Sequence, residues 1–405
     1  MLLKIAWRNI WRNKLRSFVV IGSIAIGVWS LIFLLSFSNG IVKSYIRKSI
    51  ETQTSHLQIH KKGFSQNEEI QFSIPNLESL DTQLEEIEDI KAFSNRSICR
   101  SMAATSHNSV GSRVIGVDPN REKKVTRIHE KIIEGTYFEQ KGKNPILLSS
   151  SMAEKLKVGL KKKVILRFQD INGEIASAAF RVCGIYDTKN RLFDDLNLFV
   201  KQSDLNRLLG MKGASHEIAI LLDSPEKAHK VKDKITDQIN SELTVMTFDE
   251  ISPEINLFNS QMKLSALIFT FIFMLGLVFG IINTMLMAVL ERMTELGMLM
   301  AIGMNNVKVF LMINIETILL ALISAPIGVL IGWLSVGYFK RVGLDLSHFS
   351  KGMQKFGISE VVYPETDYNL YILFIAAVFI TAIIGSIYPA IKAIRLKPVE
   401  AIRKI

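Results

Sequence analysis

Hydrophobic residues along this chain are gathered in four long uninterrupted runs instead of at the short periods of a soluble protein. The second run, Leu264–Leu290, contains twenty-seven residues without one charge, whereas about 20 apolar residues are enough for a helix to cross a bilayer. The pattern therefore predicts four transmembrane helices. The four runs are Phe18–Phe37, Leu264–Leu290, Val309–Phe339 and Asn369–Ile391.

The second run is the end of a longer predicted helix. Ser252, Pro253 and Glu254 form a typical helix start, with a capping residue, a proline at the first position and an acid near the positive end of the dipole. A helix from Pro253 to Leu290 would be roughly 57 Å long, and a hydrocarbon core is only about 30 Å thick. Apolar residues keep helical spacing after the first run as well, over residues 39–54. We expect two stalks outside the membrane.

The period of the pattern changes to two after the first stalk, and His56–His60 alternates as a strand does. Strands and helices then mix, which predicts an α+β domain with a mixed sheet. Asn172–Gly173 predicts a type I′ hairpin turn. Further predicted strands are Ser112–Val117, Lys163–Phe168, Ala178–Ile185, Glu217–Leu222 and Thr244–Phe248, and predicted helices are Leu77–Ile87, Ser150–Leu156 and Ser224–Ile239.

Lysine and arginine residues beside the runs set the expected orientation. Residues 1–17, 291–308 and 392–405 carry net charges of +5, 0 and +4, which is most of the chain's formal +11. We therefore expect these flanks, and both termini, on the cytoplasmic side and the large domain outside. The cytoplasmic flanks therefore explain the positive net charge of the chain, and nucleic-acid binding is not needed to explain it. The first run is expected to be a signal anchor, because no small-x-small cleavage site follows it.

Three features of the helical segments predict close packing or special positions. Trp7 and Trp11 lie four residues apart among basic residues, which favours an interfacial helix over a mere charged flank. Glu316 lies inside the third run, about two turns from its cytoplasmic end, and should face the bundle and find a partner. A structural role is favoured over a proton relay, because the four runs contain no second Asp or Glu and no Lys or His. Small residues four apart occur in three runs: Ser23 with Gly27, Gly276 with Gly280, and Gly328 with Gly332.

The sequence contains no recognisable catalytic constellation. There is no P-loop and no H-E-x-x-H, C-x-x-C or G-x-S-x-G motif, and His56 with His60 lacks the further ligands of a metal site. We predict no catalytic residues, no metal site and no enzyme activity of this chain by itself. Cys99 and Cys183 are the two cysteines, and buried free thiols are favoured over a disulfide.

An aromatic and methionine stripe runs along the second stalk and run. Wound at 100° per residue, Phe258, Met262, Phe269 and Phe273 fall within a narrow arc. Phe269 and Phe273 lie in the apolar run, but Phe258 and Met262 precede Lys263 near the outer boundary, where something must cover them. Protein packing and a lipid chain are equally good candidates for this cover. The lipid chain is a candidate because Met and Phe side chains suit variable lipid shapes.

The sequence resembles the FtsX-like permease family of ABC systems in three places: AWRNIWRNKLRS, ERMTELGMLMAIGM and YPAIKAIRLKPVEAIR. The domain after the first run is similar to MacB-type periplasmic domains, as at Gly116–Pro119 and Met152–Val158, and TSHLQIH (residues 54–60) is most like the lipoprotein-releasing branch. That branch includes a permease with a long carrier-docking hook. The tight turn at Asn172–Gly173 leaves no obvious room for one, so carrier docking stays open.

The resemblance implies one span, a large outer domain and three further spans, with a cytoplasmic coupling helix that contacts an ATPase. Arg292 and Glu295 are three apart and share a helical face. The residues expected at the coupling contact are Arg292, Glu295, Gly297, Met298, Ala301 and Gly303, and those expected to contact lipid or cargo are Phe258, Met262, Phe269 and Phe273.

The expected division of the chain follows from the runs and the resemblance together. It comprises a cytoplasmic amphipathic helix (1–17), helix 1 with its stalk (18–54), a periplasmic MacB-like domain (55–252), a stalk with helix 2 (253–290), a coupling helix (291–308), helix 3 (309–339), a periplasmic loop (340–368), helix 4 (369–391) and a cytoplasmic tail (392–405).

The leading hypothesis is a permease subunit that extracts lipoproteins from the inner membrane by transmitted motion. ATP and Mg would bind a separate ATPase dimer, and no cofactor is expected in this chain. Other expected partners are a second permease, the same or homologous, lipoprotein cargo and membrane lipids, with a periplasmic carrier left open. The alternatives are a MacB-like exporter of peptides or drugs and an FtsX-like regulator of a periplasmic hydrolase, although regulators usually have a much smaller outer domain.

Overall fold

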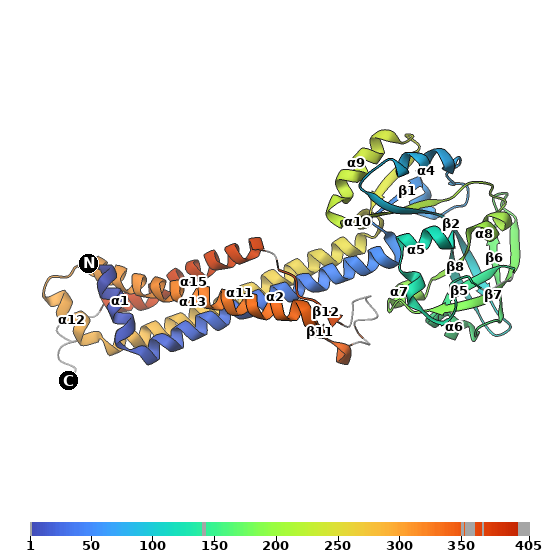
Figure 1. Cartoon of the computed structure of the whole chain (residues 1–405). Coiled ribbons are helices and arrows are strands. Elements are labelled where there is room, and N and C mark those ends of the chain that lie inside the picture. Colours follow the sequence, from blue (N-terminus) through green and yellow to red (C-terminus); the bar gives the residue numbers. More distant parts are fainter. Residues whose placement is uncertain (1, 140–142, 350–351, 353–360, 367, 396–405) are drawn as a thin grey trace. The chain divides into compact units, whose positions relative to one another are not determined.

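The computed structural model describes residues 2–139, 143–349, 352, 361–366 and 368–395. Within these residues, four helices are long and apolar enough to cross a membrane (Figure 1). They are Ser17–Thr54, Pro253–Glu291, Asn306–Val342 and Ile375–Ile394. The predicted tail lies outside the described residues from position 396 onward, and so does much of the predicted 340–368 loop.

Two compact units make up the chain. The helical unit comprises residues 1–42, 259–345 and 361–405, and the β-sheet unit comprises residues 43–258 and 346–360. The helices that contribute to the helical unit are α1 (Leu2–Arg12), α2 (Lys14–Ser49), α11 (Pro253–Glu291), α12 (Met293–Ala301), α13 (Asn306–Val342) and α15 (Tyr368–Ile394). β11 (Leu344–Asp345) pairs antiparallel with β12 (Val361–Val362).

Close approach of two backbones holds α13 against α2. A Cβ added to Gly328 would lie 2.6 Å from the carbonyl oxygen of Ala25, and one added to Gly332 would lie 2.9 Å from a methyl group of Ile32. The Trp29 indole N–H also donates to Ser335 Oγ, at 3.1 Å. The small pair of the third run is therefore a packing contact, as small residues in membrane helices commonly are.

The other two small pairs behave differently from the pair on α13. Gly27 approaches a methyl group of Leu277 on α11, at 2.8 Å from an added Cβ, whereas Gly276 and Gly280 have no atom within 4 Å of an added Cβ. Sequence spacing alone therefore identified small pairs but not which of them face another helix of this chain.

The β-sheet unit is α+β, as predicted, with a ten-stranded mixed sheet. Its strand order is β10-β1-β9-β2-β3-β8-β5-β7-β4, and β6 pairs with β2 and β7. The strands are β1 (Leu57–Lys61), β2 (Ile90–Ala104), β3 (Ser109–Val117), β4 (Ile132–Gly135), β5 (Pro145–Ser149), β6 (Lys163–Gln169), β7 (Ile175–Tyr186), β8 (Asn197–Lys201), β9 (Glu217–Leu222) and β10 (Leu243–Thr247).

Short helices connect and cover these strands. Asp118 caps the start of α5 by accepting from two backbone N–H groups, and Ser149 caps α6 by accepting from the Met152 N–H. The helices are α3 (Phe64–Asn67), α4 (Leu77–Glu85), α5 (Pro119–Val125), α6 (Ser150–Leu156), α7 (Arg191–Asp194), α8 (Gln202–Leu209), α9 (Ala228–Gln238) and α10 (Phe248–Ile251), and a π-helix, η1 (Ile50–Thr54), ends the first stalk.

The predicted type I′ turn at Asn172–Gly173 is wrong. Gly173 has a φ of +83°, but Asn172 does not have a positive φ, and a type I′ turn needs two such residues. The Asp170 carboxylate accepts from the N–H groups of Asn172 and Glu174, at 2.9 and 2.8 Å. This side-chain contact favours a type I turn followed by a left-handed glycine, which gives a three-residue loop.

The two cysteines are free and buried, as predicted. The Cys183 thiol donates to the Ile146 carbonyl at 3.2 Å, and burial raises the pKa of the Cys99 thiol to about 12. Both thiols therefore act as small apolar core groups.

Replacement of Gly328 by alanine should destabilise the helical unit, because the added methyl would meet the Ala25 carbonyl oxygen and the stiff, β-branched Val28 side chain. We expect a loss of about 1–3 kcal/mol of unfolding free energy, measured by denaturant titration in detergent. Gly337→Ala is the matched control on the same helix, since an added Cβ there meets nothing within 4 Å. Equal stability of the two variants would contradict the proposed contact.

Candidate functional site

A break after α11 creates the short helix that the sequence predicted near Glu291–Asn306. Arg292 leaves the helical conformation, with φ −102° and ψ 20°, and α12 begins at the next residue. Gly303, with a φ of +102°, reverses the chain after α12. Asn305 then caps α13 by accepting from the Val307 N–H. The segment is therefore a separate short helix between two long ones.

Arg292 supplies the partner that Glu316 was predicted to need. Its guanidinium lies 3.1 Å from Glu316 Oε1, and the two side chains are only 11% and 9% exposed. The same guanidinium donates to the Asn9 carbonyl of α1, at 2.8 Å. Removal of one member of a buried ion pair typically costs about 3–5 kcal/mol. Arg292 thus joins α1 and α13 at the start of α12.

Glu295 also contacts α1, where it pairs with Arg12. Both side chains of this pair are roughly half exposed, and such surface pairs contribute at most about 1 kcal/mol. Arg292 and Glu295 therefore both contact α1, although Arg292 precedes α12 and only Glu295 lies on that helix. A cavity of about 400 Å³ lies beside these residues, between α1, α11, α12 and α13.

The remaining residues predicted at the coupling contact divide by exposure. Gly297 is buried, whereas Met298, Ala301 and Gly303 are exposed. Ile302, directly after α12, is 86% exposed. Met298, Ala301 and Ile302 thus form an exposed apolar surface at the C-terminal end of α12.

The stripe predicted on α11 has a partial cover within the β-sheet unit. The ring of Phe258 packs on that of Tyr45 from the first stalk, with centroids 4.8 Å apart. Met262 is half-buried, and Phe269 and Phe273, in the helical unit, are 48% and 40% exposed. Protein packing therefore accounts for part of the covering of Phe258.

A buried arginine that the sequence analysis missed lies at the centre of the β-sheet unit. The Arg96 guanidinium on β2 pairs with Glu122 of α5 at 2.7 Å and with Glu217 of β9 at 2.6 Å. It also donates to the Gln53 carbonyl at the end of the first stalk, at 3.0 Å. Burial alone would lower the pKa of Arg96, but the two carboxylates raise it above its ordinary value.

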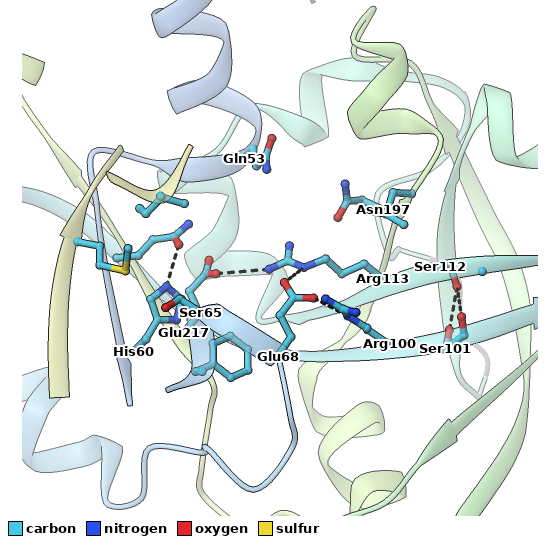
Figure 2. Close-up of a pocket in the computed structure, with 16 residues that line it drawn as sticks. Gln53, His60, Ser65, Glu68, Arg100, Ser101, Ser112, Arg113, Asn197 and Glu217 are labelled. Atoms are coloured by element: carbon cyan, nitrogen blue, oxygen red, sulfur yellow. Dashed lines mark hydrogen bonds and ion pairs between the residues drawn. The ribbon is translucent and has the colours of Figure 1, made fainter. Parts of the chain in front are cut away.

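The ion pairs continue outward from Arg96 as a chain of alternating charges, which we call the charge chain. Arg113 lies 3.8 Å from Glu217 and 2.8 Å from Glu68, and Glu68 lies 3.2 Å from Arg100. Figure 2 shows these side chains along one wall of a pocket, a cavity of about 610 Å³. The members of the charge chain are Glu122, Arg96, Glu217, Arg113, Glu68 and Arg100. Its three carboxylates balance its three guanidinium groups.

Two buried histidines in the same unit must be neutral. The Nδ1 of His56 accepts from the Leu222 N–H at 3.0 Å, and the Nδ1 of His216 accepts from the Ile98 N–H at 2.9 Å. Burial lowers the pKa of each ring to about 4. Among the described residues, no three His, Cys, Asp or Glu side chains are grouped as metal ligands.

Comparison with known families gives two matches that together cover most of the chain. The model of the MacB-like periplasmic core domain matches residues 17–238, more than half of the chain, and the model of the FtsX-like permease C-terminal matches residues 267–398. The chain is a member of the FtsX/MacB-type family of ABC transporter permeases. The four long apolar helices and the match to a MacB-like periplasmic core domain together indicate a membrane protein with an extracytoplasmic domain.

Individual relatives of this family are distant. The chain is 23% identical to the macrolide export ATP-binding/permease protein MacB of Campylobacter jejuni over 99% of its own length and 61% of that protein. It is 21% identical to an uncharacterised ABC transporter permease of Methanocaldococcus jannaschii, over 99% and 97% of the two chains. The chain thus spans about three fifths of the MacB relative and nearly all of the archaeal permease.

One solved structure is similar to part of this chain. The periplasmic region of MacB from Actinobacillus actinomycetemcomitans gives a TM-score of 0.36 at 15% identity, covering 52% of this chain and 95% of that one.

The β-sheet unit of this permease should lose stability as the pH falls. Both histidine pKa values lie below the ordinary value of 6.5, so below pH 6.5 the unfolded chain binds protons that the folded chain does not. The stabilisation is present above pH 6.5 and decreases as the pH falls toward 4. Melting of the full-length protein at pH 7.5, 6 and 5 should show this decline.

A substitution at His216 separates this effect from general acid sensitivity. His216→Asn places a non-titrating oxygen near the position of Nδ1, so it should flatten the decline. His107→Asn is the control, because His107 is exposed, and it should leave the decline unchanged. A decline of equal size in His216→Asn and the unaltered protein would contradict the assignment.

Proposed function

We propose that this permease belongs to an ABC transporter that extracts lipoproteins from the inner membrane and releases them toward the outer membrane. The observation that carries the proposal is the continuity of α11. It is one helix of thirty-nine residues, which begins at Pro253, two residues after α10, and ends at Glu291, the residue before Arg292. A helix without a break can transmit a displacement of α12 over about 58 Å. The chemistry of ATP hydrolysis would reside on the partner ATPase dimer, which would bind ATP and Mg.

The choice of lipoproteins as cargo rests on the resemblance at Thr54–His60 and on the methionine and aromatic stripe of α11. The MacB relatives favour the second candidate, an exporter of peptides or drugs. The size of the matched core domain, residues 17–238, argues against an FtsX-like regulator of a hydrolase. A second permease, the same or homologous, would complete the membrane part.

The basic flanks support an orientation in which both termini and α12 lie in the cytoplasm and the β-sheet unit in the periplasm. The N-terminal residues 1–17 would form an interfacial helix. In α1, the rings of Trp7 and Trp11 lie 6.0 Å apart and are 45% and 38% exposed, which suits residues at a membrane interface. We keep the domain bounds that the sequence predicts, with the coupling helix at residues 291–308.

The ATPase contact in this proposal is the open apolar surface of Met298, Ala301 and Ile302. Gly303 ends this surface, and buried Gly297 allows α12 to pack closely on the bundle. Arg292 and Glu295 would act as positioning residues, because their side chains hold α12 to α1 and α13. A push on α12 would therefore move three helices together.

Aspartate at Met298 or Ile302 should weaken the ATPase contact at least about tenfold, because an unpaired charge in an apolar interface is costly. ATPase retention on immobilised permease and cargo-stimulated ATP hydrolysis would measure the effect. Asn306→Asp is the matched control, since it adds the same charge at an exposed position nearby. Normal ATPase retention in both test variants would remove α12 as the contact.

A photo-crosslinker at Met262 should capture lipoprotein, and ATP should release it. Met262 is the sharper position, because Phe258 is already covered in part by Tyr45. Ser260, about 160° from Met262 around the helix, is the control and should capture far less. Capture of peptides or drugs in place of lipoprotein would favour the exporter, and capture of protein unchanged by nucleotide would leave the stripe as packing.

A further inference from the structure

One strand of the β-sheet unit has a partly uncovered edge. β3 pairs with β2 from Ser109 to Val117, but β8 covers its other edge only from Arg113 onward. The Arg113 N–H donates to the Leu196 carbonyl at 2.8 Å, and there the chain departs into α7. Residues two apart along a strand direct their N–H and C=O groups to the same side. The N–H and C=O of Gly111 therefore face the side that β8 does not reach.

This uncovered edge opens into the 610 Å³ cavity, which Gly111 lines. Gly111 is exposed, and no atom lies within 4 Å of a Cβ added to it. A cavity of this volume falls within the usual range for ligand sites, about 300–1,000 Å³. An open strand edge with unpaired backbone groups is a template for another strand.

A buried acceptor in the same cavity lacks a donor. Asn197 is 4% exposed, and its Nδ2 donates to the Phe193 carbonyl at 2.9 Å. Its Oδ1 has no hydrogen-bond partner among the described residues. Buried polar atoms are nearly always paired, so this oxygen points to a ligand that donates an N–H or O–H. Figure 2 shows Asn197 and Gln53 beside Arg113, around the same hollow.

The charges and rings of the wall restrict the class of ligand. Arg100 and Arg113 are both engaged by Glu68, and Arg113 also lies near Glu217, so the wall is balanced and does not favour a phosphate or other strong anion. The ring of Phe64 is 1% exposed and is stacked between His60 and His216, so it offers no free face for a sugar. Amide donors and acceptors remain.

We propose that this cavity binds an extended polypeptide segment, which adds to the Gly111 edge of β3 as a further strand and donates an N–H to Asn197 Oδ1. Strand addition of this kind gives affinity through main-chain hydrogen bonds and little sequence selectivity. The identity of the peptide rests on the proposed function: in lipoprotein release it would be the polypeptide that follows the lipid anchor.

The sharpest variant is Gly111→Pro. Proline removes the outward N–H of Gly111 and leaves the β2–β3 ladder intact, because that N–H faces away from β2. Gly111→Ala is the matched control, since it keeps the N–H and the added methyl has open space. Asn197→Ala is an independent variant that removes the unpaired acceptor and keeps the strand edge, in case the proline variant does not fold.

The test uses the full-length permease with its ATPase in nanodiscs. The probe is an unacylated ten-residue peptide of Ser, Gly and Asn with one benzophenone, applied without ATP. We expect labelling of β3 and of residues 190–196 in the unaltered protein and in Gly111→Ala. Labelling affinity should fall about two- to tenfold in Gly111→Pro and Asn197→Ala, which is the effect of one hydrogen bond.

Three results would overturn the proposal. They are no labelling of β3 by the unacylated peptide, equal labelling affinity in Gly111→Pro and Gly111→Ala, and labelling of the same segment by a triacylated cysteine that carries no peptide. None of these readouts involves an acyl-bearing cargo crosslinked at Met262 or ATP-driven release. Failure of peptide binding and failure of the lipoprotein proposal are therefore seen separately.

Discussion

A guanidinium withdrawn from water cannot shed its proton, so the structure around Arg96 must supply compensating charge and acceptors. Glu122, Glu217 and the Gln53 carbonyl do so from three different elements: a helix, a neighbouring strand and the end of the first stalk. If any of the three shifted alone, the buried guanidinium would lose a hydrogen-bond partner that water does not replace. The end of the stalk is therefore fixed to the sheet by electrostatics as well as by packing.

The helical unit repeats this arrangement around Arg292. Here too one arginine joins a buried carboxylate, Glu316, to a main-chain carbonyl, that of Asn9. In the proposed mechanism a displacement of α12 must reach the β-sheet unit through long helices, and it would be lost at any joint that slides. Buried ion pairs resist sliding, because a stretched pair loses attraction while its desolvation cost remains. The charge chain would extend the same coupling from Gln53 to the wall of the peptide cavity.

Much of the fold could be predicted from the period of the hydrophobic pattern and the length of the apolar runs. The buried contacts of Arg96 and Arg292 could not. β6 alternates between buried and exposed along its whole length, and such a strand is visible in the sequence. β2 was missed because its buried centre, Ser94–Ser97, is polar. Arg292 and Glu316 are twenty-four positions apart on different helices, and no periodicity connects them. Asp118–Pro119 did offer a capping signal for α5 that could have been used.

Sequence patterns are equally silent on how much of each long helix this chain covers, and α11 is covered least of the four. Its apolar window is 6% buried, against 39–44% for the other three long helices, yet hydrophobicity is similar in all four because lipid and protein neighbours are equally apolar. Gly276 and Gly280 lie on this helix with open space around them, and small residues four apart allow a second backbone to approach closely. Because α11 makes few contacts with the rest of its own chain, a displacement of this helix would break few of them. In the proposed transporter, this open surface of α11 would suit the second permease.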